Sequence, residues 1–183
     1  MSRVLRQTFF QRPTLVVAEE LLGKFLVLQD ADGKENAYLI REVEAYDGPE
    51  DLASHASRGK TARTSIMFGP GGYWYVYLIY GMYWMLNIVT GDAEYPAAIL
   101  IRGVGEYDGP GKLTRRLGID KRFNERLATK QMGLWIEDRG PLSVSSTIKK
   151  TPRIGVDYAG PIWSKKHYRF VLEEKKLIPR KKK

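Results

Sequence analysis

The chain has 183 residues, 43% of them hydrophobic and 28% charged, and it contains no cysteine. This composition is typical of a globular protein, and the lack of cysteine excludes disulfides, thiolate nucleophiles and cysteine-ligated metals. A formal net charge of +9 favours a polyanionic partner such as nucleic acid, because bound phosphates release condensed counterions. The alternative is a basic but merely solvated surface.

We expect a single domain over residues 1–183, with a basic tail at about 175–183. His55 and His167 are the only histidines and lie far apart in the chain, so we expect neither a metal site nor a cofactor. Residues 1–12 lack the apolar core of a signal peptide, and no apolar run is long enough to span a bilayer. We therefore expect no membrane association and a cytoplasmic location, with the nucleoid in a bacterium, or a nuclear location in a eukaryote.

The first predicted elements are a helix and two strands. Thr14 is expected to cap a helix over 14–22, and Gly23 to end it in the left-handed conformation. Strands are expected over 24–29 and 36–44, joined by a turn. The polar stretch 47–63 that follows is predicted to be a loop, where binding and catalytic groups usually gather.

Aromatic and β-branched residues then dominate positions 73–80, which predicts a strand. Gly81 predicts the turn of a hairpin, and 82–90 the returning strand. Further strands are expected at 97–103, 134–137, 148–156 and 167–173, and short helices at 112–117 and 123–129. These elements predict an α/β fold of the α+β type: a mixed, largely antiparallel curved sheet with flanking short helices and a protruding β-hairpin.

Three side chains that can carry chemistry alternate along the second predicted strand. Glu42, Glu44 and Tyr46 share one face of that strand, because side chains two positions apart point the same way. A partly buried carboxylate at a strand end, beside an aromatic ring, has a pKa that burial can raise towards that of a general base. The alternative is that these acids are solvated or paired with cations.

Tyrosines are repeated in the first strand of the predicted hairpin, where Tyr73, Tyr75 and Tyr77 share a face. A strand buried on both faces explains the apolar residues between them but not the phenols, each of which needs a hydrogen-bond partner when buried. Tyrosine rings also stack on bases, and Tyr80 at the turn is placed to act as a wedge between base steps or simply to pack. Lys112 at a helix start suggests a phosphate site, whereas most other cations suit a solvated face.

Taken together, these patterns resemble the alkyladenine (methylpurine) DNA glycosylase family, in unbroken order from about Leu5 to Leu172. The matching segments are Glu44-Ala45-Tyr46, Gly48-Pro49-Glu50-Asp51 with His55, residues 75–83, Asn87, and Gly109-Pro110-Gly111-Lys112-Leu113. Several motifs that agree in order and spacing are more specific than any one of them alone.

The resemblance implies a role for each matching position. Glu44 would be the general base that activates a water molecule, which Arg102 and the backbone carbonyl of Val156 would help to hold. The remaining roles are a base pocket formed by Tyr46, His55, Tyr77 and Asn87, the last of which would reject guanine; intercalation by Tyr80; and DNA-backbone contacts by Thr61, Arg63, Met82, Tyr83 and Lys112.

The resemblance also implies a monomeric, monofunctional enzyme of base excision repair that acts on double-stranded DNA. It would flip alkylated or deaminated purines, the class of 3-methyladenine, 7-methylguanine, ethenoadenine and hypoxanthine, and hydrolyse the N-glycosidic bond to leave an abasic site. No lysine stands in the pocket motifs, so we expect no strand cleavage.

Two other classes of function remain open at this point. A catalytically silent nucleic-acid-binding module would use the tyrosines and cations but leaves Glu44 unexplained. A carbohydrate hydrolase would use Glu42 or Glu44 with Asp51. Against it, neighbours on one strand cannot readily face each other across a sugar, and the positive charge suits phosphates better.

Overall fold

The computed structural model describes residues 2–141 and 146–174, and the predicted basic tail lies outside these ranges. The described chain forms a ten-stranded sheet whose main path runs β1-β8-β2-β3-β6-β5-β4, with β10 on β3, β9 on β10 and β7 on β6. The strands are β1 (Arg3–Val4), β2 (Phe25–Gln29), β3 (Glu35–Asp47), β4 (Trp74–Ile79), β5 (Tyr83–Val89), β6 (Ala97–Val104), β7 (Tyr107–Asp108), β8 (Leu134–Asp138), β9 (Ser146–Thr151) and β10 (Arg169–Glu174).

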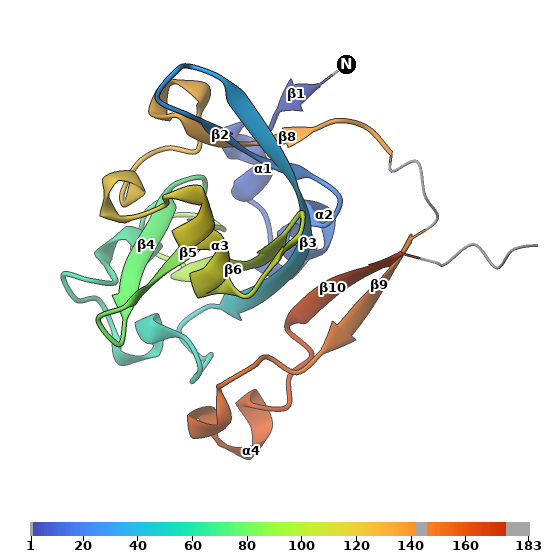
Figure 1. Ribbon diagram of the computed structural model, residues 1–183. Helices are drawn as coiled ribbons and strands as arrows, with labels where there is room; N and C mark the ends of the chain where they lie inside the picture. The colour runs from blue at the N-terminus through green and yellow to red at the C-terminus, as the bar shows by residue number, and fades with distance from the viewer. Residues whose placement is uncertain (1, 142–145, 175–183) are drawn as a thin grey trace, which may run out of the picture.

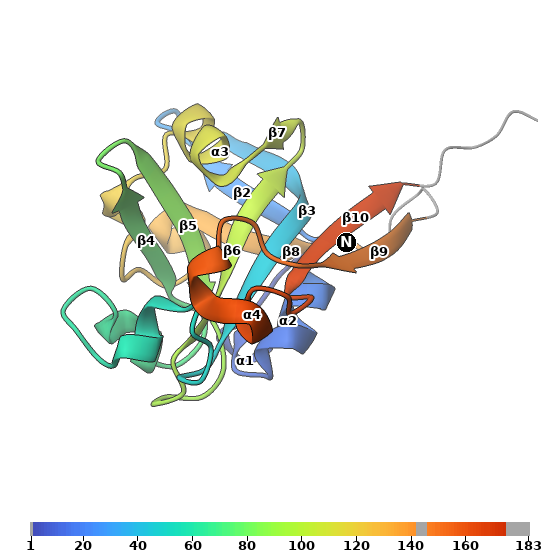
Figure 2. The same ribbon diagram turned by 90° about the horizontal axis from the view of Figure 1, so that it is seen from below.

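The helices are short and lie around this sheet (Figures 1 and 2). They are α1 (Gln7–Phe10), α2 (Thr14–Leu21), α3 (Pro110–Leu117) and α4 (Gly160–Trp163), with 3-10 turns at His55–Arg58, Ser65–Phe68, Lys121–Phe123, Lys130–Met132 and Asp157–Ala159. The predicted fold class is confirmed. Every strand pair within the described ranges is antiparallel, including those of the predicted hairpin, β4 and β5.

Strand β3 connects the two parts of the sheet. Its first half pairs with β2, and its second half pairs with β6 on one edge and with β10 on the other. A bulge between Ile40 and Val43 separates the halves, and a bulge of this kind bends and twists its strand. In Figure 1 the strand therefore crosses most of the molecule and carries its C-terminal half to the side opposite β1 and β8.

The sheet around β3, β6, β5 and β4 has one face in the hydrophobic core. Alternate residues such as Val43, Ile88 and Ile101 are fully buried there, packed with α2 and α3 through Leu21 and Leu113. Period-two alternation then leaves the residues between them on the other face. That second face carries the tyrosines and acids that the sequence singled out.

The structure corrects two predictions about helices. Thr14 does not cap α2, because Pro13 is the cap residue and the buried Thr14 hydroxyl is bonded instead to that of Thr90, at 3.1 Å. Residues 123–129 form no helix either. They run along the edge of β4, where backbone bonds such as Trp74 N to Arg126 O, at 2.8 Å, pair groups that an edge strand would leave open.

The predicted strand over 148–156 is also too long. Strand β9 ends at Thr151, because Pro152 has no N–H to donate to a ladder. The chain then leaves the sheet and crosses to the second half of β3. None of the helices within residues 2–141 and 146–174 has the length and apolarity that a membrane-spanning helix needs.

Trp74 anchors the hairpin in the core, and its replacement tests this packing. Its ring is fully buried and its indole N–H donates to Leu134 O at 3.0 Å. We expect Trp74→Phe to lower the free energy of unfolding by at least about 2 kcal/mol, because it leaves a void and an unpaired carbonyl. Leu78→Ala, on the same strand but 40% exposed, should cost about 0.5 kcal/mol. Urea unfolding measures both, and equal losses would contradict this account.

Candidate active site

A cavity of about 670 Å³ lies over the second face of the sheet. Cross-strand register aligns Glu44, Leu100, Asn87 and Tyr75 in one row across β3, β6, β5 and β4. Their same-face neighbours two positions away, among them Tyr46, Arg102 and Tyr77, join them on that face, and all of these residues except Glu44 line the cavity. The predicted pocket residues, which are far apart in the sequence, therefore lie together.

Glu44 lies directly beneath the cavity floor. Its Oε1 accepts the backbone N–H of Ile154 at 2.8 Å, and its Oε2 accepts the Tyr46 hydroxyl at 3.1 Å and Nη1 of Arg102 at 3.2 Å. The sequence predicted a partly buried carboxylate at a strand end, but the side chain is 0% exposed and β3 continues to Asp47. The three residues that hold the carboxylate also line the cavity, so they form the layer between the two.

The environment of Glu44 favours its protonated form more than water does. Burial raises the pKa of this carboxyl above its ordinary value, and the Arg102 cation and the Ile154 N–H oppose that rise only in part. A carboxylate accepts about four hydrogen bonds, and three are supplied here by protein groups. Glu44 thus has the raised pKa expected of a general base and room for one more donor.

Glu42 is a different kind of acid, although it points to the same side of β3. Its Oε1 accepts Nε of Arg102 at 2.8 Å and Nε of Arg169 at 2.7 Å. Burial acts to raise the pKa of Glu42, but the hydrogen bonds from Arg169 and Arg102 outweigh it and the pKa is lowered. Glu42 therefore stays ionised and fixes Arg102 beside Glu44, a function the sequence did not predict.

Aromatic rings form the wall on the hairpin side. The His55 ring meets Tyr77 edge-on, with 4.8 Å between centroids, and Tyr75 lies 5.0 Å from Tyr77. His55 Nδ1 is 3.1 Å from the Tyr75 hydroxyl. Burial, helped by the cations Arg63 and Arg58, lowers the pKa of His55 to about 4, so this ring is neutral at neutral pH. Tyr75 was not predicted as a pocket residue, although its alternation with Tyr77 was a sufficient signal.

Thr61 and Arg63 come from the polar loop and also line the cavity. The Arg63 guanidinium lies over the Tyr77 ring, 4.6 Å from its centroid, and its Nη2 is 3.4 Å from His55 Nε2. The Thr61 hydroxyl is bonded to that of Thr64, at 3.0 Å, which closes the loop on itself. Arg63 therefore covers part of the aromatic wall.

Asn87 and Val156 are both fixed by backbone bonds. The Asn87 amide donates to Tyr75 O at 3.1 Å and to Met85 O at 3.3 Å, which holds it rigidly in the floor. Val156 lines the opposite wall, and its carbonyl accepts the N–H of Ala159 at 2.9 Å. One acceptor position of that carbonyl remains for another donor.

The hairpin tip projects beside the cavity. Tyr80 is 83% exposed and has φ +52°, a left-handed conformation that costs a residue with a side chain about 1–2 kcal/mol. Met82 and Tyr83 are exposed next to it, and Gly111 packs so closely on Tyr83 that a Cβ there would come within 2.8 Å of the ring. Lys112 is exposed in the first turn of α3. Of the exposed tip and helix residues, Tyr80 alone borders the cavity.

Across the described ranges, no three His, Asp or Glu side chains gather in a way that could hold a metal ion. The cavity is lined by the fixed guanidinium of Arg102, the neutral imidazole of His55 and several phenol rings, and the buried carboxylate of Glu44 lies beneath them. These groups suit acid–base chemistry on a flat, electron-poor ring system.

Comparison with known proteins agrees with this chemistry. The family model of methylpurine-DNA glycosylase matches residues 8–107 and 104–176. A Legionella pneumophila (strain Corby) protein is 42% identical over 96% of this chain and 98% of its own length. One from Myxococcus xanthus is 41% identical over 95% and 92%, and one from Sodalis glossinidius 45% identical over 85% and 91%. All three are named, provisionally, 3-methyladenine DNA glycosylase. The chain belongs to the methylpurine-DNA glycosylase family.

Proposed function

We propose that this DNA glycosylase removes alkylated or deaminated purines, the class of 3-methyladenine, 7-methylguanine, ethenoadenine and hypoxanthine, from double-stranded DNA. The damaged nucleotide is flipped into the cavity, and a water molecule activated by Glu44 attacks C1′ of the deoxyribose. The bond between C1′ and the base nitrogen breaks, the base leaves with the bonding electrons, and an abasic site remains. The observation that carries this proposal is the buried Glu44 carboxylate, which has a raised pKa and lies under an aromatic-walled cavity.

Glu44 has two tasks in this reaction. As the base departs, positive charge develops on the sugar, and a carboxylate beneath it stabilises that charge. The same carboxylate accepts the proton of the attacking water through its remaining acceptor position, which Tyr46, Arg102 and Ile154 must open to the cavity as the damaged nucleotide binds. Arg102, held by Glu42, favours the ionised form of Glu44 and orients it, and the Val156 carbonyl can accept a hydrogen bond from the second O–H of that water.

The cavity walls suit damaged purines. Tyr46 and Tyr77 offer π faces that attract a base carrying positive charge, and such a base leaves as a neutral molecule, which needs no general acid. Arg63 already lies over Tyr77 as a cation and has to move when a base stacks there. The rigid Asn87 in the floor disfavours guanine, whose exocyclic amino group needs space at that edge.

The exposed residues around the cavity fit the DNA duplex. Tyr80 would fill the gap that the flipped nucleotide leaves in the stack, which offsets part of the unstacking cost. Thr61, Arg63, Met82, Tyr83 and Lys112 would contact the backbone on either side. A net charge of +9 strengthens this binding through counterion release.

Replacing the carboxyl tests the proposal directly. We expect Glu44→Gln to release base from a hypoxanthine-containing duplex at least about 100-fold more slowly, the scale of a lost general base, while it still binds that duplex. Alkaline cleavage of abasic sites measures release, and gel retardation measures binding. Glu137→Gln, a buried acid on β8 far from the cavity, is the matched control. Full release by Glu44→Gln would mean that another group activates the water, whereas no release by the parent protein would leave a nucleic-acid-binding module.

The pH dependence should identify the same group. Glu44 acts only when ionised, so the rate of base release should fall as pH falls through its pKa, which lies above 4.5. His55, with a pKa of about 4, stays neutral through that range. Single-turnover rates measured from pH 4.5 to 8 should therefore fall towards low pH, and we call this part of the profile the acid limb. His55→Asn should show the same acid limb with the same midpoint. Loss of the limb in His55→Asn would assign it to the histidine instead.

Replacing Tyr80 separates its proposed role as a wedge in the DNA stack from its effect on protein stability. Tyr80→Gly removes the ring and places at φ +52° the residue that best tolerates a left-handed conformation. We expect the free energy of unfolding to stay equal or rise by up to about 1 kcal/mol, whereas excision from duplex DNA falls about tenfold or more because the stack is no longer filled. Excision from single-stranded DNA should change less. An equal loss on both substrates would contradict the wedge.

A further inference from the structure

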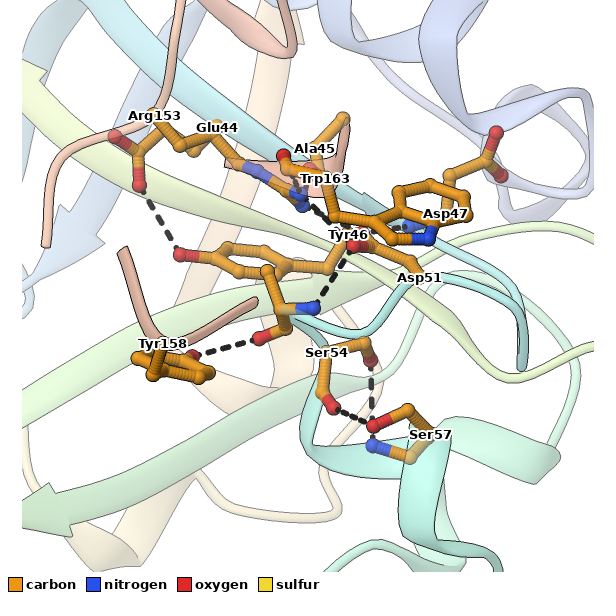
Figure 3. Close-up of polar contacts among 12 residues, drawn as sticks. Glu44, Ala45, Tyr46, Asp47, Asp51, Ser54, Ser57, Arg153, Tyr158 and Trp163 are labelled. Atoms are coloured by element: carbon orange, nitrogen blue, oxygen red, sulfur yellow. Dashed lines mark hydrogen bonds and ion pairs between the residues drawn. The ribbon is translucent and has the colours of Figure 1, made fainter. Parts of the chain in front are cut away.

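A buried ion pair between Asp51 and Arg153 adjoins the cavity. Both side chains are 0% exposed, and the guanidinium donates to both carboxylate oxygens, with 2.8 Å from Nη2 to Oδ1 (Figure 3). Asp51 also accepts the N–H groups of Asp47 and Ala53, each at 3.1 Å. The pair thus joins the loop after β3 to the segment after β9.

Stability is a weak reason for such a pair. Desolvation of two buried charges costs about as much as their attraction returns, and apolar side chains of similar volume are often equally stable. Nε of Arg153 lacks a hydrogen-bond partner, which adds to the cost. The geometry that the pair imposes on its surroundings is a stronger reason.

Arg153 and the peptide that follows it contact Glu44, Ala45 and Tyr46, three consecutive residues of β3. Nη1 donates to Ala45 O at 2.9 Å, the Ile154 N–H donates to Glu44 Oε1 at 2.8 Å, and the guanidinium lies 4.8 Å from the Tyr46 ring centroid. Figure 3 shows Arg153 beside Ala45 and Tyr46, with the Tyr46 hydroxyl aimed at the Glu44 carboxylate. The orientation of Arg153 therefore decides where two of the three donors to Glu44 lie.

The other side of the guanidinium holds the segment that closes the cavity. Nη2 donates to Trp163 O at 3.3 Å, and the cation also lies 5.2 Å from the Tyr168 ring. Tyr158, on the same connection, donates its hydroxyl to Ala53 O at 2.9 Å, next to the loop that Asp51 organises. The connection from β9 to β10, which includes α4, is thus tied to β3 at several points (Figure 2).

We infer that Arg153 is a positioning residue for base excision, and that Asp51 holds its guanidinium in the orientation that aligns the Ile154 amide and Tyr46 with Glu44. This inference rests on the proposed function. Arg153 touches neither the base nor the water. It acts through Glu44, whose donors it places.

Loss of this alignment should change the pKa of Glu44 in a direction that can be measured. The charged and polar groups that face Glu44 are Glu42 and Tyr46 on β3, Arg102 on β6, Arg169 on β10, Tyr77 on β4, and Arg153, the Ile154 N–H and Tyr158 on the crossing segment. The Ile154 N–H lowers the pKa of Glu44. Displacing it raises that pKa further, whereas exchanging Asp51 and Arg153 together removes one negative and one positive charge and leaves the net charge near Glu44 unchanged.

The test is the double variant Asp51→Leu/Arg153→Met, which exchanges the ion pair for apolar side chains of similar volume. We expect a melting temperature within a few degrees of the parent and damaged-duplex binding within about threefold. Single-turnover excision should fall about 10- to 100-fold, the effect of a small misplacement of reacting groups. The acid limb of the rate should move to higher pH. A purely structural pair would leave both the rate and the limb unchanged, and that result would overturn the inference.

Further variants keep the test decisive. Arg153→Lys retains a cation but not the planar fork, so excision should recover only in part. Lys24→Met/Asp138→Leu removes an ion pair between the residue before β2 and the end of β8, neither of which lines the cavity, and should leave rate and limb unchanged. If the apolar double variant does not fold, Asp51→Asn, which keeps the shape, is measured in the same way, and an unchanged rate and limb there would overturn the inference. Full release by Glu44→Gln would instead refute the proposed role of Glu44, on which this inference rests.

Discussion

The burial of one carboxylate organises this structure. Glu44 has no exposed surface, and a buried ionised group is tolerated only when hydrogen bonds and opposite charge replace the lost water. A backbone amide, a phenol and a guanidinium do so, and they come from a crossing segment, from β3 itself and from β6. The sheet, the β9–β10 connection and the loop after β3 are arranged so that these donors meet at one point.

Two acids on one strand face illustrate how neighbours rather than residue type decide chemistry. Glu42 accepts two arginines and has a lowered pKa, whereas Glu44 lies deeper and has a raised one. Groups whose environments push their pKa values apart are a usual sign of divided roles. In the proposed reaction the first holds Arg102 and the second activates water. The arrangement also argues against a sugar hydrolase that pairs either acid with Asp51, because Asp51 is committed to Arg153.

The cavity depends on the two unlike faces of a twisted sheet. One face carries the aliphatic residues that fold the protein, and the other carries tyrosine and asparagine, against which His55 packs from the loop after β3. Because the rigid core fixes the strands, the polar face keeps its geometry although the chain has no cysteine and so no disulfide. The strained Tyr80 at the hairpin tip is the exception, since it has a left-handed backbone and an exposed ring, which the proposed wedge role would explain.

Much of this was predictable from the sequence, because alternation along strands is a local property. It placed Glu42, Glu44 and Tyr46 on one face and Tyr75 with Tyr77 on another, located the turn at Gly81, and identified the family through several motifs in order. The local pattern predicted the wrong structure at 123–129, which pair with the otherwise open edge of β4, and at 152–156, where Pro152 ends the strand. Only the tertiary structure brought Arg153 to Asp51 and Ile154 to Glu44, across 102 and 110 residues. Such pairings are decided by the path of the chain and by the need to satisfy buried charge, and neither can be predicted from the residues next to them in the sequence.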